Sequence, residues 1–500
     1  MTHVHDHDHS HNHDTGPAHS ERHRPLYHVT PPQHWMNDPN GLIQWQGIFH
    51  LFYQHNPFGS LWGNMHWGHA ISRDLVHWEH LPIALTPDED GPDDGGCFSG
   101  VAIDADGTPT LIYTGVRKPD HEPQLPCLAT SDDPLLRTWT KFPGNPIIPG
   151  PPTGIDAVIF RDHTVWREDG IWYQGIGSGI AGEGGTVLVY RSDDLLTWEY
   201  LHPLVVGDAT QTEPFPTGTG WECPDFFEVD GRAGLIFASH GPGGLNVAWL
   251  TGDYVNHRLL PSATGLVDAG PSFYAPQSFT DETGRRIMIG WLRERRADDA
   301  QVADGWSGAM TLPRKLSIGE DGTLHSTPVP EIAQLRGEHT ALTADDIAED
   351  GTVTTAAGDA IELQATFSPA SEPVGLLVRR DAATGEHVRI TVDPHAGELI
   401  LDTTSGSTDP GTFGMRTVER VALEAGAPIA LRVFIDRSVI EVFLNDRIAV
   451  SDRVYPFSHE ATGIAVIGRE LLQALDAWQM QPMRVTSIEA EVTGEPGPVR

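Results

Sequence analysis

The chain repeats one hydrophobic pattern, in which two apolar segments typical of β-strands flank a short polar turn that contains glycine. The turn glycines are Gly47, Gly107, Gly170, Gly231 and Gly284, and successive glycines are 60, 63, 61 and 53 residues apart. A glycine turn between two such segments predicts a β-hairpin. The predicted hairpins span residues 42–54, 101–114, 164–174, 225–239 and 278–291. A hairpin that recurs about every sixty residues indicates a repeat architecture.

A second pattern, a Ser-Asp turn followed by tryptophan, recurs out of phase with the hairpins. It runs from Ser72 to Trp78, from Ser131 to Trp139 and from Ser192 to Trp198, and the tryptophans are 61 and 59 residues apart. We expect these three tryptophans to lie in the core. Sixty residues suit a four-stranded unit, so the two patterns together predict a five-bladed β-propeller over residues 29–330.

The region after residue 330 lacks both patterns. Residues 331–345 are predicted to form a linker with a short helical turn, and residues 346–500 a β-sandwich, because strands such as 429–444 alternate apolar and polar positions. On that alternation Glu441 should face solvent. With Gly 53, Pro 39 and 20% charged residues, the composition of the 500-residue chain also favours a turn-rich, all-β protein with more than one core. The predicted fold is therefore all-β, a five-bladed β-propeller followed by a C-terminal β-sandwich.

The chain is strongly acidic, with 69 acidic against 32 basic residues and a net charge of -37. This charge disfavours binding to nucleic acid or an anionic membrane. No apolar segment is long enough to span a bilayer or to act as a signal peptide, so we expect a cytoplasmic protein. Three cysteines without metal-site spacing suggest reduced thiols. Residues 1–28 form a His-rich tail that we expect to be disordered, with weak metal affinity only.

Candidate functional residues occupy equivalent positions in the five repeats. Eight to ten residues before each turn glycine stand, in order, Asp38, Ser99, Asp162, Glu222 and Tyr274. The innermost strands of a propeller face a central channel, so these five side chains should meet in one pocket.

Three carboxylates beside aromatic rings fit glycoside hydrolysis, in which one carboxyl acts as an acid and another stabilises the reacting carbon. The aromatic candidates for packing against a sugar are Trp62, Trp67, Phe98, Tyr274 and Trp291. A Ca²⁺ or Mg²⁺ site is less favoured, because Arg161 competes for the carboxylate of Asp162. A serine nucleophile at Ser99 lacks the Gly-x-Ser-x-Gly context. We expect no metal and no cofactor.

Five segments of the chain resemble the β-fructosidases of glycoside hydrolase family 32, which include invertases, inulinases, levanases and sucrose-6-phosphate hydrolases. The segments are residues 35–41, 62–70, 160–162, 221–224 and 273–277. The resemblance implies that Asp38 is the nucleophile, Glu222 the general acid and base, and Asp162 the transition-state stabiliser. It also implies fructose-binding roles, which together with the hydroxyl of Tyr274 give the substrate-binding set Asn37, Gln54, Trp62, Phe98, Ser99, Arg161 and Tyr274.

The expected activity is retaining hydrolysis of terminal β-D-fructofuranosides, with a small carbohydrate as the substrate. Alternatives are a fructosyltransferase with the same intermediate, or a carbohydrate-binding propeller without catalysis. The choice among sucrose, its 6-phosphate, inulin and levan stays open, as does a homo-oligomer.

Three local expectations accompany this assignment. Residues 35–41 should form a type I turn that presents Asp38, because Asp-Pro-Asn-Gly has that turn chemistry. The pKa of Glu222 should be raised so that it can act as an acid. His163 stands where the family usually has proline, and we expect its side chain at the surface.

Overall fold

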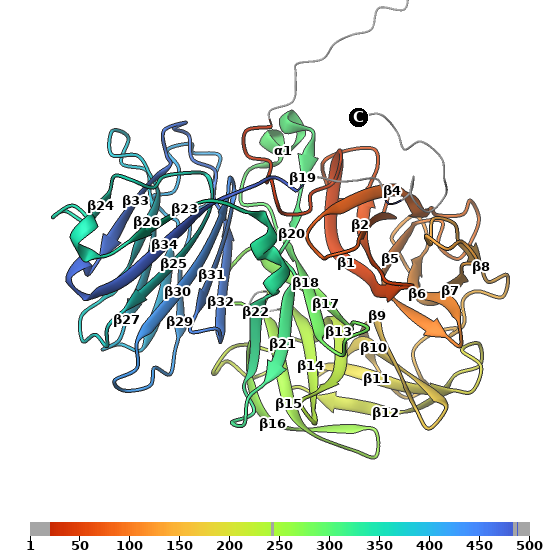
Figure 1. Cartoon of the computed structure of the whole chain (residues 1–500). Coiled ribbons are helices and arrows are strands. Elements are labelled where there is room, and N and C mark those ends of the chain that lie inside the picture. Colours follow the sequence, from red (N-terminus) through yellow and green to blue (C-terminus); the bar gives the residue numbers. More distant parts are fainter. Residues whose placement is uncertain (1–20, 242–244, 484–487, 489–500) are drawn as a thin grey trace, which may run out of the picture.

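The computed structural model describes residues 21–241, 245–483 and 488, and this part of the chain is built almost entirely of β-strands (Figure 1). Its helical elements are short, namely α1 (Asp298–Asp304) and the 3-10 helices η1 (Pro330–Leu335), η2 (Ala344–Asp346) and η3 (Arg469–Leu471). No helix in these residues is long and apolar enough to cross a membrane. The all-β prediction is confirmed.

Residues 34–328 form five antiparallel sheets of four main strands each. The first contains β1 (His34–Trp45), β2 (Ile48–Asn56), β3 (His66–Ser72) and β4 (Trp78–Leu85), with β19 (Trp306–Ser307) beside β1. The second contains β5 (Gly96–Ala105), β6 (Thr108–Val116), β7 (Gln124–Thr130) and β8 (Thr140–Lys141). The third contains β9 (Ala157–Glu168), β10 (Ile171–Ile180), β11 (Gly184–Ser192) and β12 (Glu199–Val206).

The fourth sheet contains β13 (Gly220–Val229), β14 (Arg232–His240), β15 (Val247–Val255) and β16 (Arg258–Leu266). The fifth contains β17 (Phe273–Thr280), β18 (Arg286–Leu292), β21 (Arg314–Ile318) and β22 (Leu324–Pro328), with β20 (Ala309–Met310) beside β18. The first strands contact one another in a closed cycle, β1 with β5, β5 with β9, β9 with β13, β13 with β17 and β17 with β1. The chain therefore brings the first strand of each sheet to one central axis.

The five predicted hairpins are confirmed, because each turn glycine lies between the first and second strand of its sheet. All five have positive φ angles, between 74° and 88°. A Cβ atom at any of them would meet no atom within 4 Å. Glycine is therefore required at these turns by the backbone conformation and not by a lack of space.

The Ser-Asp-Trp pattern forms the same turn three times, each time between the third and fourth strand. The indole nitrogens of Trp78, Trp139 and Trp198 donate to the carbonyl oxygen three residues earlier, at 2.9, 2.8 and 2.9 Å. The residues that accept these bonds are leucines with positive φ angles. Trp78 is buried in a core, as expected, whereas Trp139 and Trp198 are only partly buried and pack against the edges of neighbouring cores.

The C-terminal part consists of two six-stranded antiparallel sheets (Figure 1). One contains β23 (Arg336–Leu342), β34 (Leu472–Met480), β25 (Ala360–Phe367), β30 (Ile429–Asp436), β31 (Val439–Leu444) and β32 (Ile448–Arg453). The other contains β24 (Thr352–Val353), β33 (Gly463–Ile467), β26 (Val374–Arg380), β27 (Val388–Asp393), β28 (Glu398–Asp402) and β29 (Arg416–Arg420). Aliphatic side chains of both sheets form one shared core.

Two predicted boundaries need correction. The helical turn expected after residue 330 is η1, but β23 pairs with β34, so residues 336–342 belong to the C-terminal sheets and not to a linker. At the N-terminus, Tyr27 and His28 are buried, and the backbone of residues 26–28 donates to Asp436. The folded chain therefore begins before residue 28. The tail before residue 21, with its His-rich tract, lies outside the described residues.

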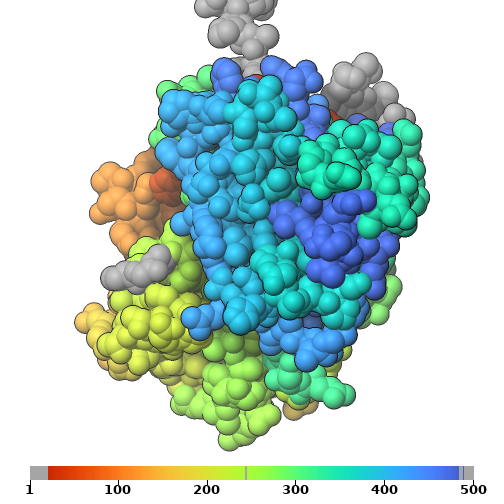
Figure 2. Space-filling model, turned by 90° about the vertical axis from the view of Figure 1, so that its left-hand side faces the viewer, coloured from red at the N-terminus to blue at the C-terminus, as the bar shows by residue number. Residues whose placement is uncertain are grey.

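The prediction that Glu441 faces solvent is wrong. Its side chain is fully buried and accepts from the guanidinium of Arg314 and from the backbone of Leu312. It also lies 3.0 Å from Nε2 of His28. Val439 and Phe443, on the same face of β31 as Glu441, pack against apolar residues of the first five sheets, so this face is an interface between the two parts of the chain and does not meet solvent. In Figure 2 the C-terminal sheets, coloured cyan to blue, face the viewer in front of the other five.

Candidate active site

The segment that carries Asp38 is a bulged strand and not the predicted type I turn. β1 pairs with β2 on both sides of residues 37–38, and the register shifts between Met36 and Pro39. An extra residue in a ladder bends the strand and re-aims its side chains. The Asp-Pro-Asn-Gly sequence is held in the ladder because its flanking residues pair with β2, and this tertiary pairing overrides the local turn preference.

The same irregularity recurs in every first strand, at the position selected by counting back from the turn glycine. The register shifts between Phe98 and Gly100 in β5, beside Asp162 in β9, after Glu222 in β13 and after Tyr274 in β17. Each shift breaks the regular alternation at the residue predicted to be functional. Five bulges at equivalent positions therefore direct five side chains towards the axis.

These side chains line one cavity of about 380 Å³, together with every other residue predicted for the site. The predicted residues in its lining are Asn37, Asp38, Gln54, Trp62, Phe98, Ser99, Arg161, Asp162, Glu222 and Tyr274. Trp291 lines it too, whereas Trp67 is fully buried and its indole nitrogen donates to the carbonyl oxygen of Phe98 at 3.1 Å. A larger hollow of about 670 Å³ lies at the turn end of the first strands and contains none of the three candidate catalytic carboxylates.

Asp38 accepts two short hydrogen bonds, and the thiol of Cys223 adds a longer contact of 3.5 Å to Oδ2. The amide of Asn37 donates to Oδ1 at 3.0 Å, and the hydroxyl of Ser99 donates to Oδ2 at 2.8 Å. Burial raises the pKa of Asp38, and these two bonds oppose the rise because they favour the ionised form. These contacts fix the orientation of the carboxylate, which lines the cavity.

Asp162 lies in the left-handed region with φ 60°, and its backbone N–H donates to the hydroxyl oxygen of Thr114 at 3.0 Å. Its Oδ2 accepts from the backbone N–H of Cys223 at 2.8 Å. Burial raises the pKa of Asp162 to about 7, while Arg161 opposes the rise and Glu222 and Asp38 add to it. The three carboxylates therefore influence one another, as like charges in a shared cavity do.

Glu222 is paired on both oxygens. The guanidinium of Arg161 donates to Oε1, and the phenol of Tyr274 donates to Oε2 at 2.5 Å. Burial alone would raise the pKa of Glu222, but Arg161 and Tyr274 outweigh it and leave the pKa below its usual value. The prediction of a raised pKa is therefore wrong for the site without substrate, because it did not include the charge of Arg161.

His163 is buried and supports Asp162, so the prediction of a surface side chain is wrong. The amide of Gln174 donates to its Nδ1 at 2.9 Å, and its Nε2 lies 3.1 Å from the hydroxyl of Thr114. Burial lowers the pKa of His163 to about 3, so the ring is neutral. Since the Thr114 hydroxyl also accepts from the backbone of Asp162, the histidine helps to fix the bulge in β9 at the position where the family pattern has proline.

Sequence reasoning missed four residues of the cavity: Asp120, His121, Gln124 and Cys223. The first three belong to the segment that joins β6 to β7 and begins β7, where no periodic position marks them. The ring of His121 lies 5.5 Å from that of Trp62 and 5.6 Å from that of Phe98. Cys223 could have been found, because it directly follows Glu222. Its thiol lies 3.4 Å from Asp162 and 3.5 Å from Asp38.

In the described part of the chain, no group of three or more His, Cys, Asp or Glu side chains is arranged to hold a metal ion. The carboxylates of the cavity instead accept from Asn37, Ser99, Arg161, Cys223 and Tyr274. These donors orient the carboxylate oxygens, and a cavity lined by oriented carboxylates and hydrogen-bond donors suits a polyhydroxylated substrate.

Bulged strands that aim three differently paired carboxylates into one aromatic cavity define a glycoside hydrolase site. The model of the glycosyl hydrolases family 32 N-terminal domain matches residues 28–328, and that of the family 32 C-terminal domain matches residues 331–479. The chain therefore belongs to glycosyl hydrolase family 32.

The chain is also similar to individual proteins over most of its length. A sucrose-6-phosphate hydrolase of Escherichia coli is 36% identical over 478 residues, which cover 91% of this chain and 94% of that protein. A raffinose invertase of Escherichia coli is 36% identical over 451 residues, or 86% of this chain and 89% of that protein. Among solved structures, fructan 1-exohydrolase IIa of Cichorium intybus matches with a TM-score of 0.82 and 27% identity, covering 93% of this chain and 98% of that one.

Proposed function

We propose that the chain is a retaining β-fructofuranosidase, which hydrolyses terminal non-reducing β-D-fructofuranosides such as sucrose or short fructo-oligosaccharides. The observation that carries the proposal is the set of three carboxylates in one cavity, each with a different environment. Asp38 is oriented by Asn37 and Ser99, and Glu222 is bound by Arg161 and Tyr274. Asp162 is held by the backbone of Cys223. Relatives with these activities support the choice of a fructoside.

The reaction uses these residues in two steps. Asp38 attacks the anomeric carbon and forms a fructosyl-enzyme ester, while Glu222 donates a proton to the leaving oxygen. Glu222 then removes a proton from water, and the water attacks the ester and releases fructose with its configuration retained. Asp162 binds ring hydroxyls and stabilises the positive charge that develops on the ring in the transition state.

Glu222 must bind a proton before the first step, and its contact with Arg161 opposes that. Hydroxyl groups of the substrate can accept from the guanidinium and draw it away from Glu222. Loss of this pairing, together with exclusion of water, raises the pKa of the carboxyl. Binding of the fructoside would therefore prepare the acid that cleaves it.

The fold around this site is assigned as a five-bladed β-propeller over residues 29–330, followed by a β-sandwich whose first strand is β23, which begins at residue 336. The closed cycle of contacts between the five first strands supports the propeller. Two six-stranded sheets with one shared aliphatic core support the sandwich. The cytoplasmic location and a homo-oligomer stay predictions.

Charges in the cavity lining favour a neutral leaving group. Among the described residues of the lining, Arg161 is the one arginine or lysine, against four acidic side chains, those of Asp38, Asp120, Asp162 and Glu222. Asp120 adds a negative charge at the exposed side. A phosphate dianion would meet uncompensated carboxylates there. We therefore assign sucrose rather than sucrose 6-phosphate as the preferred substrate.

Product chromatography tests this assignment, with sucrose at low and high concentration and with sucrose 6-phosphate, inulin and levan. We expect glucose and fructose from sucrose and slower cleavage of the phosphate ester. Transfer products that dominate at high sucrose concentration would indicate a fructosyltransferase. Absence of any released sugar would favour the carbohydrate-binding alternative. NMR of the first fructose anomer released should show retention.

The variant Glu222→Gln tests the acid. Loss of general acid and base catalysis should lower kcat on sucrose by about a hundredfold or more, with the thermal midpoint preserved. Glu228→Gln is the matched control, since Glu228 lies on the same strand, is exposed and is remote from this cavity. Unchanged turnover in Glu222→Gln would rule out its assignment.

A further inference from the structure

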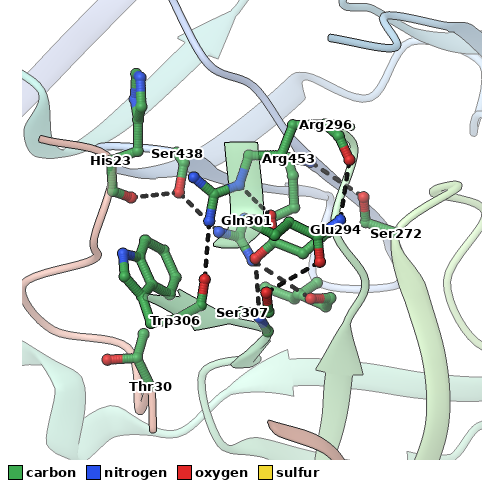
Figure 3. Close-up of polar contacts among 12 residues, drawn as sticks. His23, Thr30, Ser272, Glu294, Arg296, Gln301, Trp306, Ser307, Ser438 and Arg453 are labelled. Carbon is green, nitrogen blue, oxygen red and sulfur yellow. Dashed lines mark hydrogen bonds and ion pairs between the residues drawn. The ribbon is translucent and has the colours of Figure 1, made fainter. Parts of the chain in front are cut away.

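A buried polar network joins the first five sheets to the C-terminal sheets (Figure 3). Its central carboxylate is that of Glu294, whose side chain is only 4% exposed. Glu294 lies two residues after the end of β18. From the C-terminal sheets and the loop after them, Arg453 pairs with its Oε1 at 3.4 Å and the phenol of Tyr455 donates to its Oε2. From its own loop, Nε of Arg296 donates to Oε2 at 2.8 Å.

The network is ionised and closely packed. Burial raises the pKa of Glu294, but Arg453 and Arg296 outweigh it and bring that pKa to about 2. Arg453 is itself buried and donates to the hydroxyl oxygen of Ser438 at 2.9 Å. A buried carboxylate with two guanidinium partners and a phenol has little freedom to move.

Glu294 also touches backbone that packs against two residues at the edge of the active site. Its Oε1 accepts from the N–H of Gly308 at 2.8 Å. A Cβ at Gly308 would lie 2.0 Å from the carbonyl oxygen of Met36 and 3.2 Å from the indole nitrogen of Trp291. Gly308 therefore packs closely against Met36, the residue before the Asn37-Asp38 bulge, and against Trp291, whose ring lines the cavity.

A second route runs through the residue next to Glu294. The guanidinium of Arg293 lies over the ring of Tyr274, 4.9 Å from its centroid, and the phenol of Tyr274 donates to Glu222. The position of Glu294 is therefore coupled to both the proposed nucleophile and the proposed acid.

We propose that Tyr455 and Arg453 are positioning residues for the active site, and that they act by fixing Glu294 against Gly308. The C-terminal sheets then contribute to turnover without touching the substrate. This inference rests on the proposed function, because turnover of sucrose is its readout. A displacement of about 1 Å at a reacting group is enough to lower a rate strongly.

The test is Tyr455→Phe, which removes one hydroxyl and keeps the ring. We expect kcat on sucrose to fall by about tenfold while KM changes by less than about twofold, since positioning affects the reacting groups more than binding. Tyr254→Phe is the matched control, because its phenol also donates to a carboxylate, Glu168, at 2.7 Å, outside this network. It should retain the kcat of the unaltered enzyme.

Each result has a defined meaning. A kcat of Tyr455→Phe equal to that of Tyr254→Phe, or a fall that merely follows the folded fraction measured by circular dichroism, overturns the proposal. If Tyr455→Phe does not fold, Arg453→Lys replaces it with the same expected split between kcat and KM. An unaltered enzyme without activity on any fructoside would instead contradict the proposed function.

Discussion

At the scale of single residues, the site contains three carboxyl groups of similar chemistry, and their different surroundings give them different pKa values. Arg161 lowers the pKa of Glu222, burial raises that of Asp38, and burial with neighbouring carboxylates raises that of Asp162 to about 7. Separated pKa values allow one carboxyl to carry a proton while another is ionised. The sequence identified the three residues, but their order of acidity depends on Arg161 and on burial.

Asp162→Asn should stabilise the protein above neutral pH while abolishing most activity. The folded-state pKa of Asp162 is raised from 3.8 to about 7, so the folded state loses stability as the pH rises through this interval and the carboxyl ionises. Asparagine does not ionise, so the variant avoids the free energy of placing a negative charge at this buried position. Relative to the unaltered protein, we expect a gain in unfolding free energy of about 1 to 3 kcal/mol at pH 8 and little gain at pH 4, measured by urea denaturation. An equal effect of exposed Asp193→Asn at pH 8 would contradict the explanation.

At the scale of elements, a register shift that recurs in the first strand of each sheet directs the site side chains into one cavity. Asp38, Ser99 and Asp162 lie at interruptions of the ladder in three first strands, and Glu222 and Tyr274 lie beside them in the other two. The count from the turn glycine found the positions because the hairpins have similar lengths. It could not find the bulges, because a count of residues from the turn does not show which residue lacks a partner in the ladder.

Asp194→Ala should weaken the third Ser-Asp-Trp turn. Asp194 accepts from the backbone of Leu196 at 2.9 Å and of Thr197 at 2.7 Å, so its loss leaves two N–H groups without their partner. We expect the free energy of unfolding to fall by about 1 kcal/mol, measured by thermal or urea denaturation. The adjacent Asp193→Ala serves as the control and should be neutral; a loss of the same size there would exclude a specific role of the turn.

At the scale of the whole molecule, buried charges join the two parts of the chain. Arg314 on β21 pairs with Asp268 at 2.9 Å and with Glu441 on β31, and all three side chains are fully buried. His28 lies between Glu441 and Asp436. Such a cluster fixes the relative orientation of the two parts, because each charge depends on partners from the other.

Glu441→Gln should destabilise the interface. It would leave the guanidinium of Arg314 without one of its two buried carboxylate partners, and loss of a buried partner costs about 3 to 5 kcal/mol. The expected result is a lower midpoint in thermal unfolding and a separate transition of the C-terminal part in calorimetry. Glu424→Gln is the control, since its side chain is 80% exposed. Equal midpoints for the two variants would refute the importance of the cluster.

The sequence alone predicted the all-β class, the five hairpins and the five equivalent positions from Asp38 to Tyr274, because turn glycines and strand alternation are local signals that repeat in register. The other predicted cavity residues, Asn37, Gln54, Trp62, Phe98 and Arg161, came from the resemblance to the family and not from the repeat. Only the tertiary structure decided which groups surround each of these side chains. Glu441 and His163 are buried by elements far away in the sequence, and Asp120 and His121 reach the cavity from an irregular loop. Burial, pKa and the contacts of Glu294 depend on which surfaces meet in space, and a local pattern of polar and apolar residues does not contain that information.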